Sequence, residues 1–264
     1  MAFPWRQAVV VAGLLLVPAA HASAEHPLSA VSSLPPSSLS GRVPTLVARV
    51  NGAPITRDLL LERLDHYLVM LGPGPAGGEA PRPDVGAAAE GQLSANRERE
   101  LLGYILRQLI LEQLKTQEAA RLGIVVSREL LEANAAGIER QAGSREAFEE
   151  QLRQGHTTPE RWRMHLQQTL LLQAVEARRR NAIPVTDEDV RRYWEKNRAA
   201  LSAYFHADRL AAIEGELREM LKDARWPEAQ EAWEDDLAGH ATVWIDPLVR
   251  MELWGATGHW RRTP

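Results

Sequence analysis

Two β-like runs, one near each end of a sequence that is otherwise helical in pattern, constrain the fold more than any other feature. The first is "TLVARVNG" at residues 45–52, and the second is "ATVWID" at residues 241–246. Between them, apolar residues recur at helical spacing. Because a strand needs a partner for its backbone N–H and C=O groups, we predict a mainly α domain whose N- and C-terminal ends close through a small two-stranded β pairing of residues 46–50 with 241–245.

The dipeptide Asn51-Gly52 normally indicates a hairpin. Here the sequence that follows, "PIT", is interpreted as the entry to a helix capped by Thr56, so no second strand is expected after the first. The helix is predicted from leucines that share one side of it: Leu59, Leu60, Leu64, Leu68 and Leu71.

A long helix is predicted over about residues 96–122, with one broad apolar face and Gly123 as its stop. Ser127 is expected to cap a third helix, residues 144–155 to form a short fourth, and Thr158 to cap a fifth that begins with Pro159. Thr186 is expected to cap the next helix, with Asp189 in the position of a capping box.

One last helix is expected to connect the helix capped by Thr186 to the second β-like run. A short link joins Asn197 to this helix, which starts near Asp208 and is broken or kinked at Pro227. The tail at residues 247–264 contains "PLVRMELWG", whose weak alternation could add a strand.

The N-terminus has the pattern of a secretory signal peptide over residues 1–24. Arg6 precedes a short apolar run, "AVVVAGLLLV", and small residues provide an A-x-A cleavage site ending at Ala22 or Ala24. Residues 25–44 are rich in Ser and Pro and are expected to be a disordered leader. The Gly- and Pro-rich residues 72–91 are expected to be a flexible insertion. We therefore expect a periplasmic or secreted protein whose domain spans residues 45–246.

Composition excludes several classes of site. The chain has no cysteine and therefore no disulfide, no thiolate metal site and no lipid-anchor cysteine. Its formal net charge of −4 gives no basic footprint for nucleic acid. The histidines are not spaced as metal ligands, and no nucleophile elbow or phosphate loop is present. No catalytic residue, metal ligand or cofactor is expected, and the protein is expected not to be an enzyme.

Five phrases in order resemble the SurA/PrsA-type exported chaperones, whose N-terminal domains are helical. These are "VARVNGAPITRDLLLERL", "LLGYILRQLILEQLKTQEAARLGIVVSREL", "REAFEEQLRQGHTTPERWRMHLQQTLLLQAV", "IPVTDEDVRRYWEKN" and the closing "ATVWID". In many members the fourth phrase leads into a parvulin-type prolyl isomerase domain. Here it is followed by "RAALSAYFHADRL", and the short link after it is too small for a domain. The resemblance implies the chaperone module without the isomerase.

The function that this resemblance implies is binding of unfolded or partly folded exported polypeptides through apolar surface. One alternative is a dedicated interaction subunit of an export or surface-assembly system, which the Trp-rich C-terminus favours. A second is an isomerase-related protein with residual activity. Trp162 is expected to pack in a core with Leu166 and Leu170, and Tyr204-Phe205 is the preferred exposed pair. The candidate client-binding residues are Met70, Trp162, Met164, Trp194, Tyr204 and Phe205.

Overall fold

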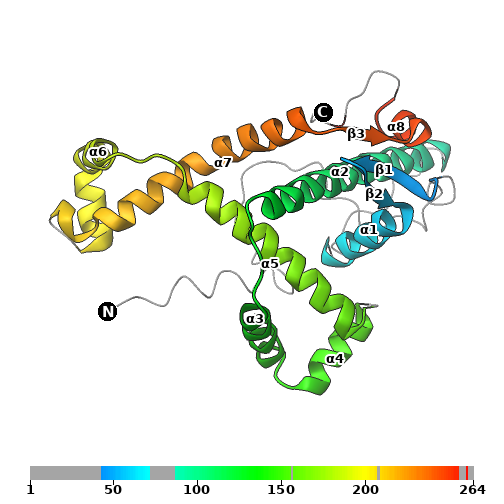
Figure 1. Ribbon diagram of the computed structural model, residues 1–264, viewed down its shortest axis with the longest axis horizontal. Coiled ribbons are helices and arrows are strands. Elements are labelled where there is room, and N and C mark those ends of the chain that lie inside the picture. Colours follow the sequence, from blue (N-terminus) through cyan, green and yellow to red (C-terminus); the bar gives the residue numbers. More distant parts are fainter. Residues whose placement is uncertain (1–42, 72–86, 156, 207–208, 256–259, 261–264) are drawn as a thin grey trace. The chain divides into compact units, whose positions relative to one another are not determined.

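The computed structural model describes residues 43–71, 87–155, 157–206, 209–255 and 260, and it confirms a mainly helical fold (Figure 1). Side chains at residues 66, 68–71 and 87–95 are outside the description. The elements in chain order are β1 (Leu46–Val50), β2 (Ala53–Thr56), α1 (Arg57–Leu71), α2 (Ala87–Arg121), α3 (Arg128–Gln141), α4 (Arg145–Gln154), α5 (Pro159–Asn181), α6 (Asp187–Phe205), the 3₁₀ helix η3 (Leu210–Ala212), α7 (Glu214–His240), β3 (Val243–Ile245) and α8 (Pro247–Trp254).

The chain divides into two compact units. Of the described residues, unit 1 comprises those up to Gln113, those in the range 125–170 and those from Thr242 onward, and unit 2 comprises those in the ranges 114–124 and 171–241. The long helices α2 and α5 each contribute one part to each unit. Each unit has its own buried residues, and the two are described separately below.

The predicted closure of the two chain ends is confirmed in unit 1. Strand β1 pairs with β3 in antiparallel fashion, with Arg49 opposite Trp244 and Val50 opposite Val243. The expected sheet was nevertheless one strand too small, because β2 also pairs with β1, which gives the strand order β2-β1-β3.

The dismissal of the Asn51-Gly52 hairpin was therefore wrong. Asn51 and Gly52 have φ values of 50° and 87°, as a type I′ turn requires, and Val50 faces Ala53 across it. Strand β2 is short and contains Pro54, so its sequence alone resembles a helix entry more than a strand. Thr56 is both the last residue of β2 and the N-terminal cap of α1. Its Oγ1 accepts a hydrogen bond of 3.3 Å from Leu59 N.

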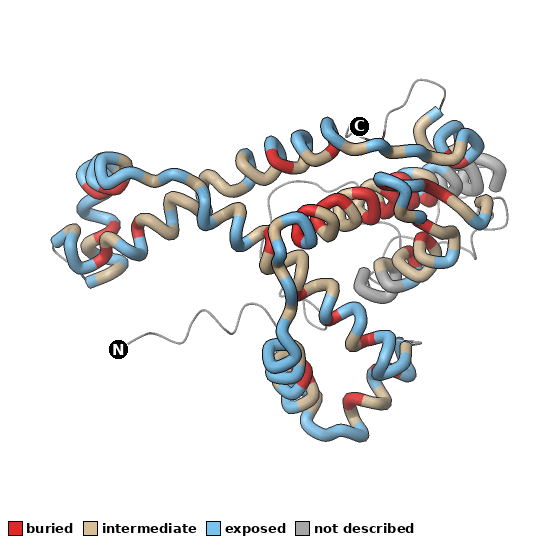
Figure 2. The backbone as a smooth tube through the Cα atoms, viewed as in Figure 1, coloured by how far each residue is buried: buried red, intermediate tan, exposed pale blue. Residues whose placement is uncertain are grey.

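The core of unit 1 consists of residues from the sheet, α1 and the first part of α2 (Figure 2). These residues are almost inaccessible to solvent: Val47, Val50, Ile55, Leu60, Leu101, Leu102, Ile105, Leu106 and Ile110. Strand β1 is the central strand, and only its Arg49 is exposed. A continuous apolar face on α2 and a nearly all-apolar central strand are the sequence features that produce this core.

Helix α8 also belongs to unit 1, and the expectation that "PLVRMELWG" could add a strand was wrong. Asp246 caps the helix, accepting a hydrogen bond of 2.9 Å from Leu248 N, and Pro247 occupies the first turn. Trp254 lies against α2 at Gly103, where an added Cβ would come within 3.1 Å of the indole Nε1. A side chain at position 103 would therefore require the indole to shift by a few tenths of an ångström.

In unit 2, α6 continues through Asn197, which has non-helical dihedrals of φ −118° and ψ 15°, and ends at Phe205. The expected link after Asn197 is thus mostly helix, and the true connection to α7 contains η3. Helix α7 has no break at Pro227. Trp226 and Trp233 lie on either side of this proline in the sequence, with ring centroids 6.4 Å apart.

The predicted caps of the other helices are confirmed by hydrogen bonds. Ser127 and Ser144 accept from the backbone N–H groups of Leu130 and Ala147 at the starts of α3 and α4. Thr158 and Thr186 do the same for α5 and α6, and the Thr186–Asp189 pair forms a complete capping box. The expected signal peptide, the leader through residue 42 and residues 72–86 of the expected insertion lie outside the described residues, whereas residues 87–91 belong to α2.

Candidate functional site

Three helices of unit 1, α3, α4 and α5, pack around an aromatic pair. Phe148 of α4 and Trp162 of α5 meet edge to face, with ring centroids 4.8 Å apart and an interplanar angle of 74°. Both are buried, together with Ala135, Ile138, Leu152, Leu166 and Leu170. The expected packing of Trp162 in a core with Leu166 and Leu170 is confirmed.

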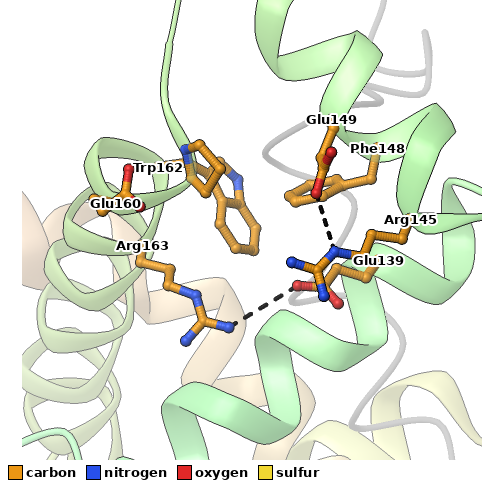
Figure 3. A pocket seen from close by; sticks show the side chains of 8 residues that line it. Glu139, Arg145, Phe148, Glu149, Glu160, Trp162 and Arg163 are labelled. Atoms are coloured by element: carbon orange, nitrogen blue, oxygen red, sulfur yellow. Dashed lines mark hydrogen bonds and ion pairs between the residues drawn. The ribbon is translucent and has the colours of Figure 1, made fainter.

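Both rings line a pocket of about 240 Å³. Figure 3 shows Phe148 and Trp162 pointing toward each other, with a rim of charged side chains around them. Arg145 Nε donates to Glu149 at 3.0 Å, and Arg163 lies 4.0 Å from Glu139. Because most of the rim charges are paired with one another, the pocket offers an aromatic floor and no strong net charge.

The polar side chains that line this pocket are glutamates and arginines. They are Glu139, Glu149, Glu160, Arg145 and Arg163. Within the described ranges, no group of three His, Cys, Asp or Glu residues is placed to hold a metal ion.

The sequence-predicted site residues are divided between the two units and between buried and exposed positions. In unit 1, Trp162 is buried, whereas Met164 on the same helix is 62% exposed. In unit 2, Trp194 is buried in a cluster with Val190 and Leu217. The side chain of Met70 lies outside the description.

Tyr204 and Phe205 form the last turn of α6, and their rings meet edge to face at 4.9 Å. Phe205 packs against the cluster that contains Trp194, and Tyr204 is 77% exposed. Of the predicted residues whose side chains are described, Met164 and Tyr204 therefore offer free apolar surface, whereas Trp162 and Trp194 are enclosed.

A group of exposed apolar side chains at β3 and α8 was not predicted. Trp244 is 42% exposed, Leu248 70% and Met251 63%. Leu248 and Met251 are three residues apart and thus lie on the same side of α8. The Asp-Pro pair at residues 246–247 is a common helix start, and attention to it could have revealed this face.

Unit 2 contains a buried ionic network that joins the end of α2 to α5 and α7. Lys115 Nζ lies 2.7 Å from Glu176 and 2.7 Å from Glu234, and the ammonium is 5.5 Å from the centroid of the Trp233 ring. Burial lowers the pKa of Lys115, but the hydrogen bonds and negative charges of the two glutamates outweigh burial and hold it above its ordinary value. Lys115 is therefore charged at neutral pH and structural in role.

Glu118 is the second centre of this network. It accepts hydrogen bonds from Arg121 at 2.6 and 2.8 Å and pairs with Arg179 of α5. The hydrogen bond from Arg121 and the contact with Arg179 hold the pKa of Glu118 below its ordinary value, although burial acts in the opposite direction. Both centres link side chains of α2 to side chains of α5.

The comparisons with known proteins define the class of this chain. Residues 8–176, more than half of the chain, match the family described as SurA-like N-terminal domain. The chain belongs to this family, which is chaperone-related, and the stretch between α6 and α7 carries η3 in place of a parvulin domain. Among curated proteins, none matches the chain. No helix in the described ranges is both long and apolar enough to cross a membrane.

Proposed function

We propose that this protein is an exported, chaperone-like protein that binds unfolded or partly folded exported polypeptides and has no isomerase activity of its own. The observation that carries the proposal is the exposed apolar surface of Trp244, Leu248 and Met251 in a member of the SurA-like N-terminal domain family. Met164 and Tyr204 supply further exposed apolar surface in the two units. The signal-peptide pattern of residues 1–24 supports a periplasmic or secreted location.

The expected affinity follows from the size of these surfaces. Fully burying a large apolar side chain contributes about 1.5–3 kcal/mol, and ordering of the client and of the exposed side chains offsets part of this gain. A flat tryptophan and a flexible methionine accept clients of different shape. Weak, reversible binding of many unrelated segments is the behaviour that such surfaces favour.

Suppression of aggregation tests the proposal. The purified protein is added to several chemically unrelated proteins as they are diluted from denaturant, and light scattering is followed. We expect suppression across these clients at near-equimolar ratios. An absence of suppression for every client would contradict the proposal. Proline-limited refolding of a test protein, followed in parallel, should not accelerate, and an acceleration would support the isomerase-related alternative.

A dedicated interaction subunit of an export or surface-assembly system is the alternative, and the Trp-rich C-terminus is the sequence feature that favours it. Four of the five tryptophans there are engaged in the protein's own packing: Trp226, Trp233, Trp254 and Trp260. This engagement weakens the argument for a Trp-based partner surface. One stable co-purifying partner, with no effect on unrelated clients, would favour the alternative.

A further inference from the structure

The sheet of unit 1 has two edges, and over the described part of the chain the outer edge of β3 has no neighbouring strand. Asp246 N donates to Val47 O at 2.9 Å, and Asn51 N donates to Thr242 O at 2.8 Å. Backbone groups alternate in direction along a strand, so those of Thr242, Trp244 and Asp246 face β1. The N–H and C=O groups of Val243 and Ile245 therefore face outward. Over the described ranges, no strand pairs with them.

The other edge, at β2, is blocked. Val50 opposite Ala53 flanks the two-residue turn and forms a hydrogen-bonded pair, so the next residue of β2, Pro54, directs its backbone away from β1. Proline has no N–H and its ring occupies the position of an incoming strand, which is a common way to protect an edge. Strand β3 has no proline and no charged residue: its sequence is "VWI".

Exposed apolar side chains accompany this open edge. Trp244 is in β3 itself, and Leu248 and Met251 are in the helix that follows directly. The backbone of Asp246 forms the junction and is held both to Val47 and, through its side chain, to Leu248 N. The edge and the helix start are thus fixed by the protein's own hydrogen bonds.

We propose that the outer edge of β3 accepts an extended, apolar segment of an unfolded polypeptide as an additional strand. This rests on the proposed function and specifies how a client is held. Outward N–H and C=O groups at strand spacing are complementary to another extended backbone and not to a helix. Recognition through the backbone is independent of sequence, and Trp244 adds a preference for apolar neighbours. Because only Val243 and Ile245 face outward, each segment is held weakly and exchanges readily.

The test uses the full chain and a matched pair of variants. Val243→Pro removes the outward N–H of the first residue of β3 and places a ring at the edge, as Pro54 does in β2, without removing a hydrogen bond to β1. Val243→Ala loses a comparable amount of side-chain packing but keeps the N–H. Thermal unfolding of both variants verifies that each one folds.

Two probes are titrated: a reduced and alkylated, permanently unfolded protein, and a soluble apolar peptide of about ten residues, a length that one strand can supply. An analogue of the peptide with alternate N-methylated residues keeps the side chains but loses the backbone donors. We expect Val243→Pro and N-methylation of the peptide each to raise the Kd about tenfold. Each change removes a backbone hydrogen bond and introduces a steric clash at the edge. Val243→Ala should change the Kd by less than about threefold.

The outcomes separate this inference from the proposed function. If the unmodified protein binds both probes and folded Val243→Pro binds them equally well, strand addition is overturned while client binding stands. Equal binding of the N-methylated peptide has the same consequence. If the unmodified protein binds neither probe, both proposals fail. If Val243→Pro abolishes self-association in sedimentation and leaves client binding unchanged, the edge pairs with a second copy and the inference is overturned.

Discussion

Trp162 of α5 meets Phe148 of α4 edge to face, with their ring centroids 4.8 Å apart. Both side chains are buried in the cluster of α3, α4 and α5. A tryptophan held in this way stabilises its own unit and presents little surface to a client. Two residues further along the same helix, Met164 is 62% exposed. Trp162 and Met164 thus lie within one turn of α5, where the first residue stabilises the core and the second offers surface for binding.

We predict that Trp162→Ala lowers the free energy of unfolding by about 3–5 kcal/mol, because it leaves a cavity against Phe148. Met164→Ala should change it by less than about 0.5 kcal/mol. Denaturant titrations followed by far-UV circular dichroism measure both values. Equal destabilisation by the two substitutions would contradict the assignment of Trp162 to the core.

Two glycines in unit 1 should respond in opposite directions to alanine. Gly52 has a φ of 87° in the β1–β2 turn, and Gly137 lies within α3 with no atom within 4 Å of an added Cβ. Gly52→Ala should destabilise by about 1–2 kcal/mol because of its left-handed conformation. Gly137→Ala should stabilise by about 0.5–1 kcal/mol because alanine favours the helix. Thermal unfolding distinguishes the signs, and a neutral Gly52→Ala would argue against the turn.

The network around Glu118 predicts sensitivity to acid. Its hydrogen bond with Arg121, assisted by Arg179, keeps the pKa of Glu118 lower in the folded protein than in the unfolded chain, where it is about 4.3. The stabilisation is present above the unfolded pKa and is lost as the pH falls through the folded pKa. Stability should therefore decline below about pH 4.3.

Glu118→Gln should reduce stability at neutral pH and flatten its dependence on pH in this acidic window. The exposed Glu231, changed in the same way to Gln, serves as the control. Urea midpoints measured in steps from neutral to acidic pH provide the comparison. Identical slopes for Glu118→Gln and the unmodified protein would show that Glu118 does not contribute.

Export predicts a specific new N-terminus. Cleavage after Ala24, at the second A-x-A site, leaves Glu25 as the first residue, and cleavage after Ala22 leaves Ser23. Mass spectrometry of the protein recovered from the cell envelope or medium checks this expectation. Recovery of only the full-length chain from the cytoplasm would refute the proposed location.

Much of the fold could be predicted from the sequence, because helix starts are marked by local capping residues and the two β-like runs could pair with each other. Hydroxyl caps such as Thr186 marked helix starts, and the β-like runs at the two ends had few alternative partners. The strand β2 was missed because four residues with a proline carry almost no periodicity. The last helix was predicted as one helix, broken or kinked at Pro227, and only the break is excluded, because α7 runs through the proline.

The candidate site was harder to predict than the fold. The sequence favoured Tyr204 as exposed, but it gave no means of telling the enclosed Trp194 from the exposed Met164, because exposure depends on tertiary packing. The open edge of β3 follows from hydrogen-bond direction in a three-stranded sheet, and that direction requires the pairing of all three strands. Residue types alone do not contain this information.

The most direct test of the account is an equilibrium titration of this protein with one labelled client in two states. The client is used permanently unfolded, after reduction and alkylation, and in its native form, with fluorescence anisotropy as the readout. We predict saturable binding of the unfolded client and none of the native one, with weaker binding by Val243→Pro. Equal binding of both forms, or no binding of the unfolded form, would contradict the proposal that this SurA-like protein holds unfolded polypeptides.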